Sequence, residues 1–275
     1  MQSSIPRVSV VMPTYNRSVL LSHAIESIRK QTFANWELVV TDDDSTDGTL
    51  AVITDWAAKD ARIKPVRNAM NQYPDISKIL NEGLARSQGE YIARLDDDDY
   101  WIDTEKLAKQ VAYLDAHPEC VIVGTGVIVM DGVGAERYRY LKRETDEAIR
   151  ESALSSNPFT HSTVLYRKSI ALEVGGYEHQ YAEDWALWLK MGQRGTMHNF
   201  PQYSIGYLMA GQNKSWEFQR TQSKTVLDIL RRFKGDYPHF WRAYFIHHLA
   251  AWYSALPTFL RDAWYPLAAR FKRFL

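Results

Sequence analysis

The sequence predicts an α/β fold with a mostly parallel central sheet covered by helices on both faces, followed by an amphipathic helical tail. In the first half of the chain, short apolar runs alternate with segments of helical spacing, which is typical of parallel sheets. Residues 237–275 are instead rich in aromatic side chains that recur at helical spacing. With 275 residues, the chain is long enough for one large domain or two modest ones.

Each predicted element of the first half has a local signal. Residues 8–12 are a short apolar run that stops at a proline, and residues 18–30 place apolar side chains at helical spacing. The following strands are expected at residues 36–40, 63–66 and 91–95, and the following helices at residues 49–59, 75–86 and 104–116. The chain contains neither a glycine-rich dinucleotide fingerprint nor a P-loop, which disfavours a dinucleotide cofactor and ordinary ATPase chemistry.

The second half has a less regular pattern. Residues 121–130 predict one long strand or two short ones, residues 136–141 a hairpin arm, and residues 161–166 a further strand. A helix is expected to begin at Glu183. Asp184 would then lie near the N-terminus of that helix, where the helix dipole favours a carboxylate.

Three polar clusters directly follow predicted strands, at residues 14–17, 42–47 and 96–99. Because ligands of parallel sheets bind at the carboxyl ends of the strands, we expect these clusters to form one site. The four consecutive aspartates Asp96 to Asp99 raise one another's pKa unless a counter-charge is present. Mg²⁺ and Mn²⁺ prefer carboxylate oxygens, and Mg²⁺ keeps positions for substrate phosphates. The run therefore predicts a metal–phosphate site, with a solvated acidic turn as the alternative.

The net charge of zero conceals an asymmetry along the chain. Residues 1–212 carry 22 Lys and Arg against 29 Asp and Glu, whereas residues 213–275 carry 11 against 4 and hold four of the nine tryptophans. A basic, aromatic, amphipathic tail suits a position on an anionic membrane surface. The alternative is that its aromatic side chains pack against the body or against a second subunit, so an oligomer is possible.

The remaining bulk features favour a cytoplasmic protein. The single cysteine, Cys120, excludes an intramolecular disulfide, and the N-terminus shows no signal segment. Together with the basic tail, these features predict a peripheral position on the inner face of the cell membrane. No nucleic-acid partner is expected.

The polar motifs, taken together, resemble those of the family 2 glycosyltransferases with the GT-A fold. The resemblance covers about residues 5–210, and its segments are Pro13-Thr-Tyr-Asn-Arg17, Asp42 to Thr49, Leu80 to Leu84, Gly89 to Asp99 and Glu183-Asp184. Asp44 stands where glycine is usual, and Asp97 fills a variable position. The resemblance implies a GT-A catalytic domain at residues 1–212, with a Rossmann-like nucleotide-binding half at about residues 1–100 and an acceptor half at about 101–212, and the amphipathic tail at 213–275 follows it.

The resemblance also implies roles for single residues. Asp184 would be the catalytic base, although a helix N-cap is the simpler role for such a residue. The acceptor side would include Glu183 and Trp185. The metal would be held by Asp98 and Asp96, with His161 as a further candidate ligand or, alternatively, a structural hydrogen-bond partner. The residues expected around the nucleotide and donor are Pro13, Thr14, Tyr15, Arg17, Asp42, Asp43, Asn81, Asp96 and Asp97.

The implied reaction is an inverting, metal-dependent transfer of a sugar from a nucleoside diphosphate to an acceptor hydroxyl. UDP is favoured by analogy, the cofactor would be Mn²⁺ or Mg²⁺, and the acceptor would be a glycan or a polyprenyl-linked sugar. Sugar-phosphate nucleotidyl transfer is an alternative, but it calls for a glycine-rich loop after the first strand, which is absent. A non-catalytic sugar-nucleotide-binding protein is another, but it would lack the base or a metal ligand.

Overall fold

The computed structural model describes residues 5–132, 134–209 and 219–255. In this part of the chain one sheet has the strand order β3-β2-β1-β4-β8-β6-β9-β5, and β7 pairs with β6. The strands are β1 (Val8–Thr14), β2 (Trp36–Asp42), β3 (Ile63–Arg67), β4 (Tyr91–Arg94), β5 (Tyr100–Trp101), β6 (Cys120–Asp131), β7 (Glu136–Tyr140), β8 (Leu165–Arg167) and β9 (Thr196–Met209). The helices are α1 (Leu21–Arg29), α2 (Thr49–Lys59), α3 (Ile76–Arg86), α4 (Lys106–Ala116), α5 (Asp146–Ser152), α6 (Lys168–Glu173), α7 (Glu183–Gly192), α8 (Gln219–Arg232) and α9 (Phe240–Ala255), with a 3₁₀ turn at His161–Thr163.

The sheet is parallel in its first half and mixed in its second. Strands β3, β2, β1 and β4 run parallel to one another. Strand β8 is antiparallel to both of its neighbours, β4 and β6, whereas β9 is parallel to β6. The predicted strand over residues 161–166 is only partly correct, because the Thr163 hydroxyl and amide both donate to the Thr160 carbonyl and close a 3₁₀ turn before β8 begins.

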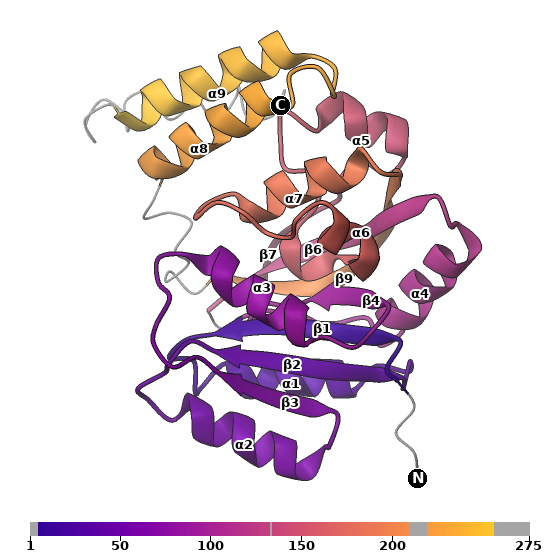
Figure 1. Ribbon diagram of the computed structural model, residues 1–275, viewed down its shortest axis with the longest axis vertical. Coiled ribbons are helices and arrows are strands. Elements are labelled where there is room, and N and C mark those ends of the chain that lie inside the picture. Colours follow the sequence, from indigo (N-terminus) through magenta and orange to yellow (C-terminus); the bar gives the residue numbers. More distant parts are fainter. Residues whose placement is uncertain (1–4, 133, 210–218, 256–275) are drawn as a thin grey trace.

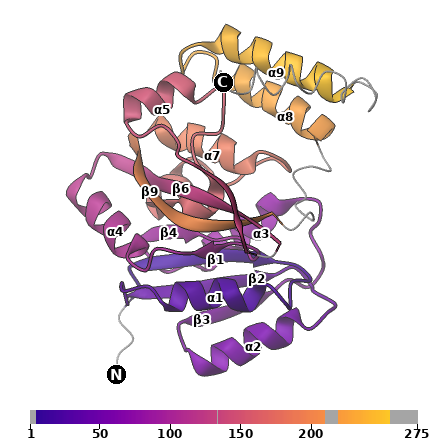
Figure 2. The same ribbon diagram turned by 180° about the vertical axis from the view of Figure 1, so that it is seen from behind.

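Helices cover both faces of the sheet (Figure 1). One core cluster joins α1, α2 and α4 to the sheet through side chains such as Ile25, Ile53 and Leu107. The other joins α3 and α7 to the opposite face through Leu80 and Trp188. Figure 2 shows α1 in front of the parallel strands, where Figure 1 shows α3. Fully burying one aliphatic side chain contributes roughly 1.5–3 kcal/mol to the free energy of folding. The helices on both faces therefore stabilise the sheet and hold its polar edge in place.

Helices α8 and α9 lie side by side at the end of the molecule beyond α7 and α5 (Figures 1 and 2). Helix α8 contributes Leu230 to the same core cluster as α7. Helix α9 is buried on one side at Ala243 but exposes Trp241, Phe245, Leu249 and Trp252 by 69, 64, 43 and 55%. Among the described residues, no helix combines the length and the apolar character needed to cross a bilayer. The kink expected at Pro257 and the rest of the predicted tail lie outside the described residues.

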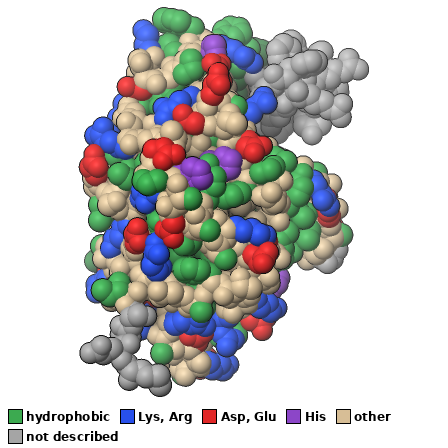
Figure 3. Space-filling view, turned by 90° about the vertical axis from the view of Figure 1, so that its right-hand side faces the viewer, with side chains coloured by type: hydrophobic (Ala, Val, Ile, Leu, Met, Phe, Trp, Pro, Cys, Tyr) green, Lys and Arg blue, Asp and Glu red, His purple; other side chains and the backbone are tan. Residues whose placement is uncertain are grey.

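The face on the right-hand side of Figure 1 is shown in Figure 3, where acidic and basic side chains are interspersed. The described residues therefore form no continuous patch of a single sign on this face. The described part of the tail instead presents apolar side chains to solvent, because Trp241, Phe245, Leu249 and Trp252 recur at helical spacing on the exposed side of α9.

Candidate active site

A cavity of about 310 Å³ opens where the carboxyl ends of β1, β2 and β4 meet. Its volume lies within the range of roughly 300–1,000 Å³ that is usual for small-molecule sites. The predicted site residues that line it are Pro13, Thr14, Tyr15, Arg17, Asp43, Asp96, Asp97, Asp98 and Glu183. Since parallel strands end at one edge of the sheet, the three polar clusters meet as expected, and the start of α7 closes the cavity.

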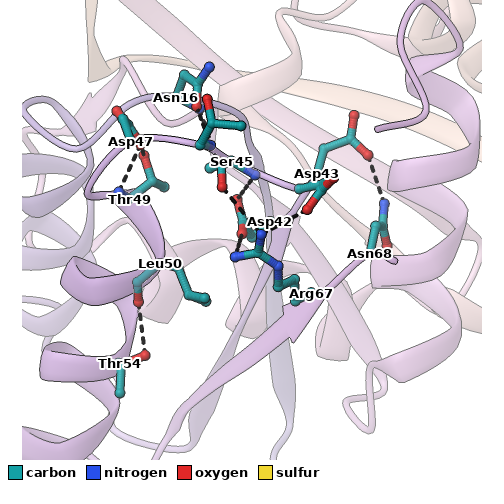
Figure 4. A network of polar contacts seen from close by, with 12 residues as sticks. Asn16, Asp42, Asp43, Ser45, Asp47, Thr49, Leu50, Thr54, Arg67 and Asn68 are labelled. Atoms are coloured by element: carbon teal, nitrogen blue, oxygen red, sulfur yellow. Dashed lines mark hydrogen bonds and ion pairs between the residues drawn. The ribbon is translucent and has the colours of Figure 1, made fainter. Parts of the chain in front are cut away.

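The loop after β2 is held in shape by its own polar side chains (Figure 4). Asp42 is buried, accepts a hydrogen bond from the Ser45 amide at 3.2 Å, and lies 3.5 Å from Arg67 Nη1. Asp44 has a φ of +61° and accepts a hydrogen bond from Arg67 Nη2 at 2.7 Å. A left-handed backbone explains why glycine is usual at this position, and aspartate is among the residues that tolerate it best. Asp42 thus shapes the loop and does not line the cavity.

Asp43 turns the other way and lines the cavity. Its carboxylate accepts a hydrogen bond from Asn68 Nδ2 at 2.9 Å (Figure 4) and another from the Gln72 amide at 3.0 Å. These contacts tie the loop after β2 to the segment before α3. Two donors hold the carboxylate in one orientation at the wall of the cavity.

Asp96 is positioned by a buried arginine. Arg94, which is 1% exposed, donates from Nη2 to Asp96 Oδ1 at 2.6 Å. Its Nε donates to His161 Nε2 at 3.0 Å, and Ser162 Oγ donates to Asp96 Oδ2 at 3.3 Å. The guanidinium is therefore a fixed positive charge beneath the acidic run, and it orients the Asp96 carboxylate at the floor of the site.

Asp97 and Asp98 have little positive charge beside them. Their nearest cation is Arg17, whose Nε lies 3.6 Å from Asp97 and whose Nη2 lies 3.9 Å from Asp98. Burial and the neighbouring Asp98 raise the pKa of Asp97 to about 7, and burial and Asp96 raise the pKa of Asp98 to about 6. Asp99 is buried, and its Oδ2 lies 2.5 Å from Ser162 Oγ, whose single proton is thus shared between Asp99 and the more distant Asp96.

This donor set fits a hard divalent cation. Three carboxylates face one cavity with a deficit of positive charge, and oxygen ligands are those that Mg²⁺ and Mn²⁺ prefer. Among the described residues, no three acidic, histidine or cysteine side chains already form a ligand group. Mg²⁺ commonly takes only one or two protein carboxylates and fills the other positions with water and phosphate oxygens, so Asp96 and Asp98 suffice.

Glu183 and Asp184 form the first turn of α7 and point to different surroundings. Glu183 lines the cavity. Asp184 Oδ2 accepts a hydrogen bond from Asn157 Nδ2 at 2.8 Å, and its Oδ1 accepts one from the Trp185 amide at 2.7 Å. Burial and the Asp184 charge raise the pKa of Glu183 to about 8. Burial also raises the pKa of Asp184, but its two hydrogen bonds and the Lys142 charge act in the opposite direction.

Besides Asp42 and Asp184, three further predicted site residues do not line the cavity, because their side chains are engaged elsewhere. Asn81 makes two hydrogen bonds to the Tyr177 backbone, at 2.8 and 2.9 Å, and braces the segment before α7. His161 Nε2 faces Arg94 Nε and the Tyr177 hydroxyl, each at 3.0 Å, so its ring is held within the protein. Trp185 is buried and donates to the Ala153 carbonyl at 2.8 Å, which makes it a core residue.

The structure also adds residues that the sequence did not indicate. Asn157 contacts the predicted base from a loop 27 residues away. Arg94 did leave a signal, because a charged residue within an apolar strand needs a buried partner. The unpredicted residues that line the cavity come from loops, from the first turn of α3 and from β9, namely Tyr73, Pro74, Ile76, Ile79, Gln180, Tyr181, Ala182 and Tyr207.

Comparisons with known proteins place these features in a family. The model of glycosyl transferase family 2 matches residues 9–175. EpsE of Bacillus subtilis (strain 168) is 38% identical over 195 residues, which cover 69% of this chain and 68% of EpsE. The amylovoran biosynthesis glycosyltransferase AmsE of Erwinia amylovora is 32% identical over 224 residues, which cover 78% of this chain and 82% of AmsE.

Solved structures share the fold at low sequence identity. TarS 1–349 of S. aureus in complex with UDP-GlcNAc has a TM-score of 0.67 and 19% identity, and the match covers 94% of this chain and 78% of TarS. The mannosyltransferase PcManGT from Pyrobaculum calidifontis in complex with GDP-Man and Mn²⁺ has a TM-score of 0.66 and 19% identity, with 97 and 80% covered. The predicted GT-A fold is thereby confirmed.

Proposed function

The chain belongs to glycosyl transferase family 2, and we propose that it moves a sugar from a nucleoside diphosphate to an acceptor hydroxyl with inversion at the anomeric carbon. The observation that carries this proposal is the cavity in which Arg17, Asp43, Asp96 to Asp98 and Glu183 converge. The family assignment leaves nucleotidyl transfer and a purely binding role without support. AmsE acts in amylovoran biosynthesis by name, and a role of this chain in surface polysaccharide assembly is part of the proposal.

The donor would lie in this cavity, with its nucleotide against the loops after β1 and β2. The diphosphate is negatively charged, as is the acidic run beside it. Arg17, which lies next to Asp97 and Asp98, can supply a positive charge that pairs with the diphosphate. Asp43 has a fixed carboxylate, which suits a hydrogen bond from the N–H of a nucleobase. UDP is the nucleotide we favour, and GDP is the alternative, because proteins of this fold bind UDP-GlcNAc in TarS and GDP-Man in PcManGT.

Asp98 and Asp96 would hold the divalent cation. Arg94 already fixes the orientation of Asp96, so the ligand oxygens need little rearrangement. When bound, the cation supplies neutralisation of the charge that develops on the leaving diphosphate. The Mn²⁺ present in the PcManGT complex supports the proposal that a divalent cation binds here.

Asp184 would be the general base. Two carboxyl groups in different surroundings divide the acid and base roles. Glu183 is the member that holds a proton near neutral pH, since its pKa is raised to about 8. Asp184 receives hydrogen bonds from Asn157 and the Trp185 amide, which stabilise its ionised form. The acceptor hydroxyl would pass its proton to Asp184 as its oxygen attacks the anomeric carbon and the diphosphate leaves.

A donor panel tests the proposed function. The full-length protein is incubated with UDP-, GDP- and dTDP-sugars, with Mn²⁺, Mg²⁺ or EDTA, and release of the nucleoside diphosphate is measured. We expect slow hydrolysis of one or a few UDP-sugars in the presence of a divalent cation. Hydrolysis of none of these donors, together with no measurable binding of any of them, would contradict the proposal.

Asp43→Asn is expected to weaken UDP binding by about tenfold, because a charge-assisted hydrogen bond to the base becomes a neutral one. Isothermal titration with UDP measures the change. Asp44→Asn is the matched control, since its carboxylate points to Arg67 and asparagine tolerates the same left-handed backbone. Equal UDP affinities for both variants would remove Asp43 from the nucleotide site.

We further propose that the C-terminal region, residues 213–275, binds the surface of an anionic membrane and presents a lipid-linked acceptor. The exposed stripe on α9 supplies the apolar side chains. Lys234 Nζ lies 4.9 Å from the ring of Trp241, so a positive charge accompanies the stripe. Aromatic side chains next to basic ones suit the headgroup region of a bilayer.

Replacing Trp241 and Phe245 together by glutamine is expected to weaken binding to phosphatidylglycerol-containing vesicles by at least about tenfold. Co-sedimentation of the full-length protein measures the binding, and high salt should reduce it. Leu172→Gln, which alters an exposed leucine on α6, serves as the control. Unchanged vesicle binding, with a shift from dimer to monomer in light scattering, would instead assign the stripe to a subunit interface.

A further inference from the structure

A second cavity, of about 470 Å³, lies beside α5 and the segment that follows β7. Lys142 and Arg143 supply its positive charge, and Ser152 and Ser156 supply hydroxyl groups. None of the described residues that line it carries a carboxylate. Its composition is the opposite of that of the donor cavity, where five acidic side chains line the wall together with Arg17.

The second cavity is joined to the proposed base by two hydrogen bonds. Lys142 Nζ donates to the Asn157 carbonyl at 2.8 Å, and Asn157 Nδ2 donates to Asp184 Oδ2 at 2.8 Å. Glu183, the preceding residue, lines the donor cavity. The Glu183–Asp184 pair therefore lies between a cavity suited to the donor and a cavity of opposite charge, as a transferase with two substrates requires.

The cations of the second cavity are only weakly balanced by acidic side chains. Among the described residues, neither Lys142 nor Arg143 forms an ion pair with a carboxylate, whereas Arg94, Arg139 and Arg150 each do. Lys142 is also half-buried, and burial lowers the pKa of its ammonium although the charge of Asp184 acts in the opposite direction, so the nearby carboxylate offsets the cost of burying this charge only in part. A bound anion would offset that cost.

A third cavity, of about 440 Å³, continues from the second, because Arg143 and Ser152 line both. It reaches Arg242 of α9, the neighbour of the exposed Trp241. Glu147 and Glu151 also line it, which makes it a poor centre for an anion. The second cavity is thus the better anion site, and the third leads from it towards the apolar stripe of α9.

We propose that the second cavity binds the phosphate of a phosphate-linked acceptor, with Lys142 and Arg143 as its ligands. This inference rests on the proposed function, since the sugar hydroxyl of such an acceptor would have to reach Asp184. It deepens that function by assigning the acceptor to an anionic class. A lipid attached to the phosphate would extend past Arg143 and Arg242 to α9.

Farnesyl diphosphate, a soluble lipid phosphate, is the probe for this site. Its binding to the full-length protein is measured by titration calorimetry in EDTA, which prevents metal-assisted binding in the donor cavity. We expect Lys142→Met and Arg143→Gln each to raise its Kd by about tenfold or more. Arg137→Gln removes an exposed arginine of β7 outside the cavity and should leave the Kd unchanged.

Two further arms identify what is recognised. Inorganic pyrophosphate with the same dependence on Lys142 and Arg143 would show that phosphate alone suffices, whereas farnesol should not bind. Equal Kd values for all variants, or displacement of farnesyl diphosphate by UDP, would overturn the site. Thermal unfolding checks that each variant folds. If Lys142→Met fails to fold, Arg143→Gln still tests the site, because Arg143 is exposed.

The donor panel separates this inference from the proposed function. A protein that binds farnesyl diphosphate through Lys142 but neither binds nor hydrolyses a nucleotide sugar would overturn the proposed function and keep the anion site. A protein that hydrolyses a nucleotide sugar but binds no farnesyl diphosphate would overturn the anion site alone.

Discussion

Asp184→Asn is expected to lower kcat for glycosyl transfer by about 10²- to 10⁴-fold, the contribution usual for a general base. The asparagine keeps the size of the side chain and can still accept a hydrogen bond from the Trp185 amide, so the fold should be retained. Affinity for the nucleotide sugar should not change, because Asp184 does not line the donor cavity. Initial rates at saturating donor, together with donor titration, measure the two effects.

Glu183→Gln is the comparison that makes this prediction specific. Glu183 lies one residue away and lines the donor cavity, and its pKa of about 8 leaves it largely protonated at neutral pH. Glutamine resembles a protonated glutamate, so this variant should retain most of its kcat. If Glu183→Gln loses transfer and Asp184→Asn does not, the base is Glu183 instead.

The pH profile provides a further check on the base. A base acts only when it is ionised, so transfer should be lost as the pH falls through the pKa of Asp184. That pKa is raised by burial, and the loss should therefore occur at a higher pH than an exposed aspartate would give. The residual activity of Asp184→Asn should lack this acid limb.

The parts of the fold that the sequence predicted are those with local signals. Strands β1, β2 and β4 contain apolar runs that end at polar residues, so pattern alone placed them within a few residues. Strand β9 was not predicted, because its 14 residues include Pro201 and Gly206 and its pairing with β6 joins residues far apart in the chain. The strand is stabilised by tertiary pairing rather than by its own propensity.

The same distinction holds for the site. Asp43 and the run from Asp96 follow strands directly, and the topology of a parallel sheet brings them together. Asn157 and Lys142 could not be predicted, because their contacts depend on how the loops after α5 and β7 meet α7. His161 and Trp185 stand within or next to predicted motifs, but their side chains pack inward, and a motif does not specify that direction.

Asp98→Asn is expected to remove the response to Mn²⁺ or Mg²⁺ and to lower kcat/KM for transfer by about 10²- to 10³-fold. The wild-type protein in EDTA should fall to a comparable level. Asparagine keeps an oxygen but loses the charge that a hard cation needs, while Asp97 and Arg17 remain in place. Metal titrations of the initial rate measure this loss, and Asp55→Asn, an exposed aspartate on α2, should behave like the wild type.

The contrast with Asp96 decides which carboxylate matters most. Asp96 is held by Arg94 at 2.6 Å, so Asp96→Asn would leave a buried guanidinium without its charged partner as well as removing a ligand. We therefore expect Asp96→Asn to lower the thermal stability, and Asp98→Asn to leave it unchanged or raise it by relieving repulsion among the aspartates. Transfer by the wild type at full rate in EDTA would refute metal dependence. A normal Mn²⁺ response in Asp98→Asn would show that another carboxylate holds the cation.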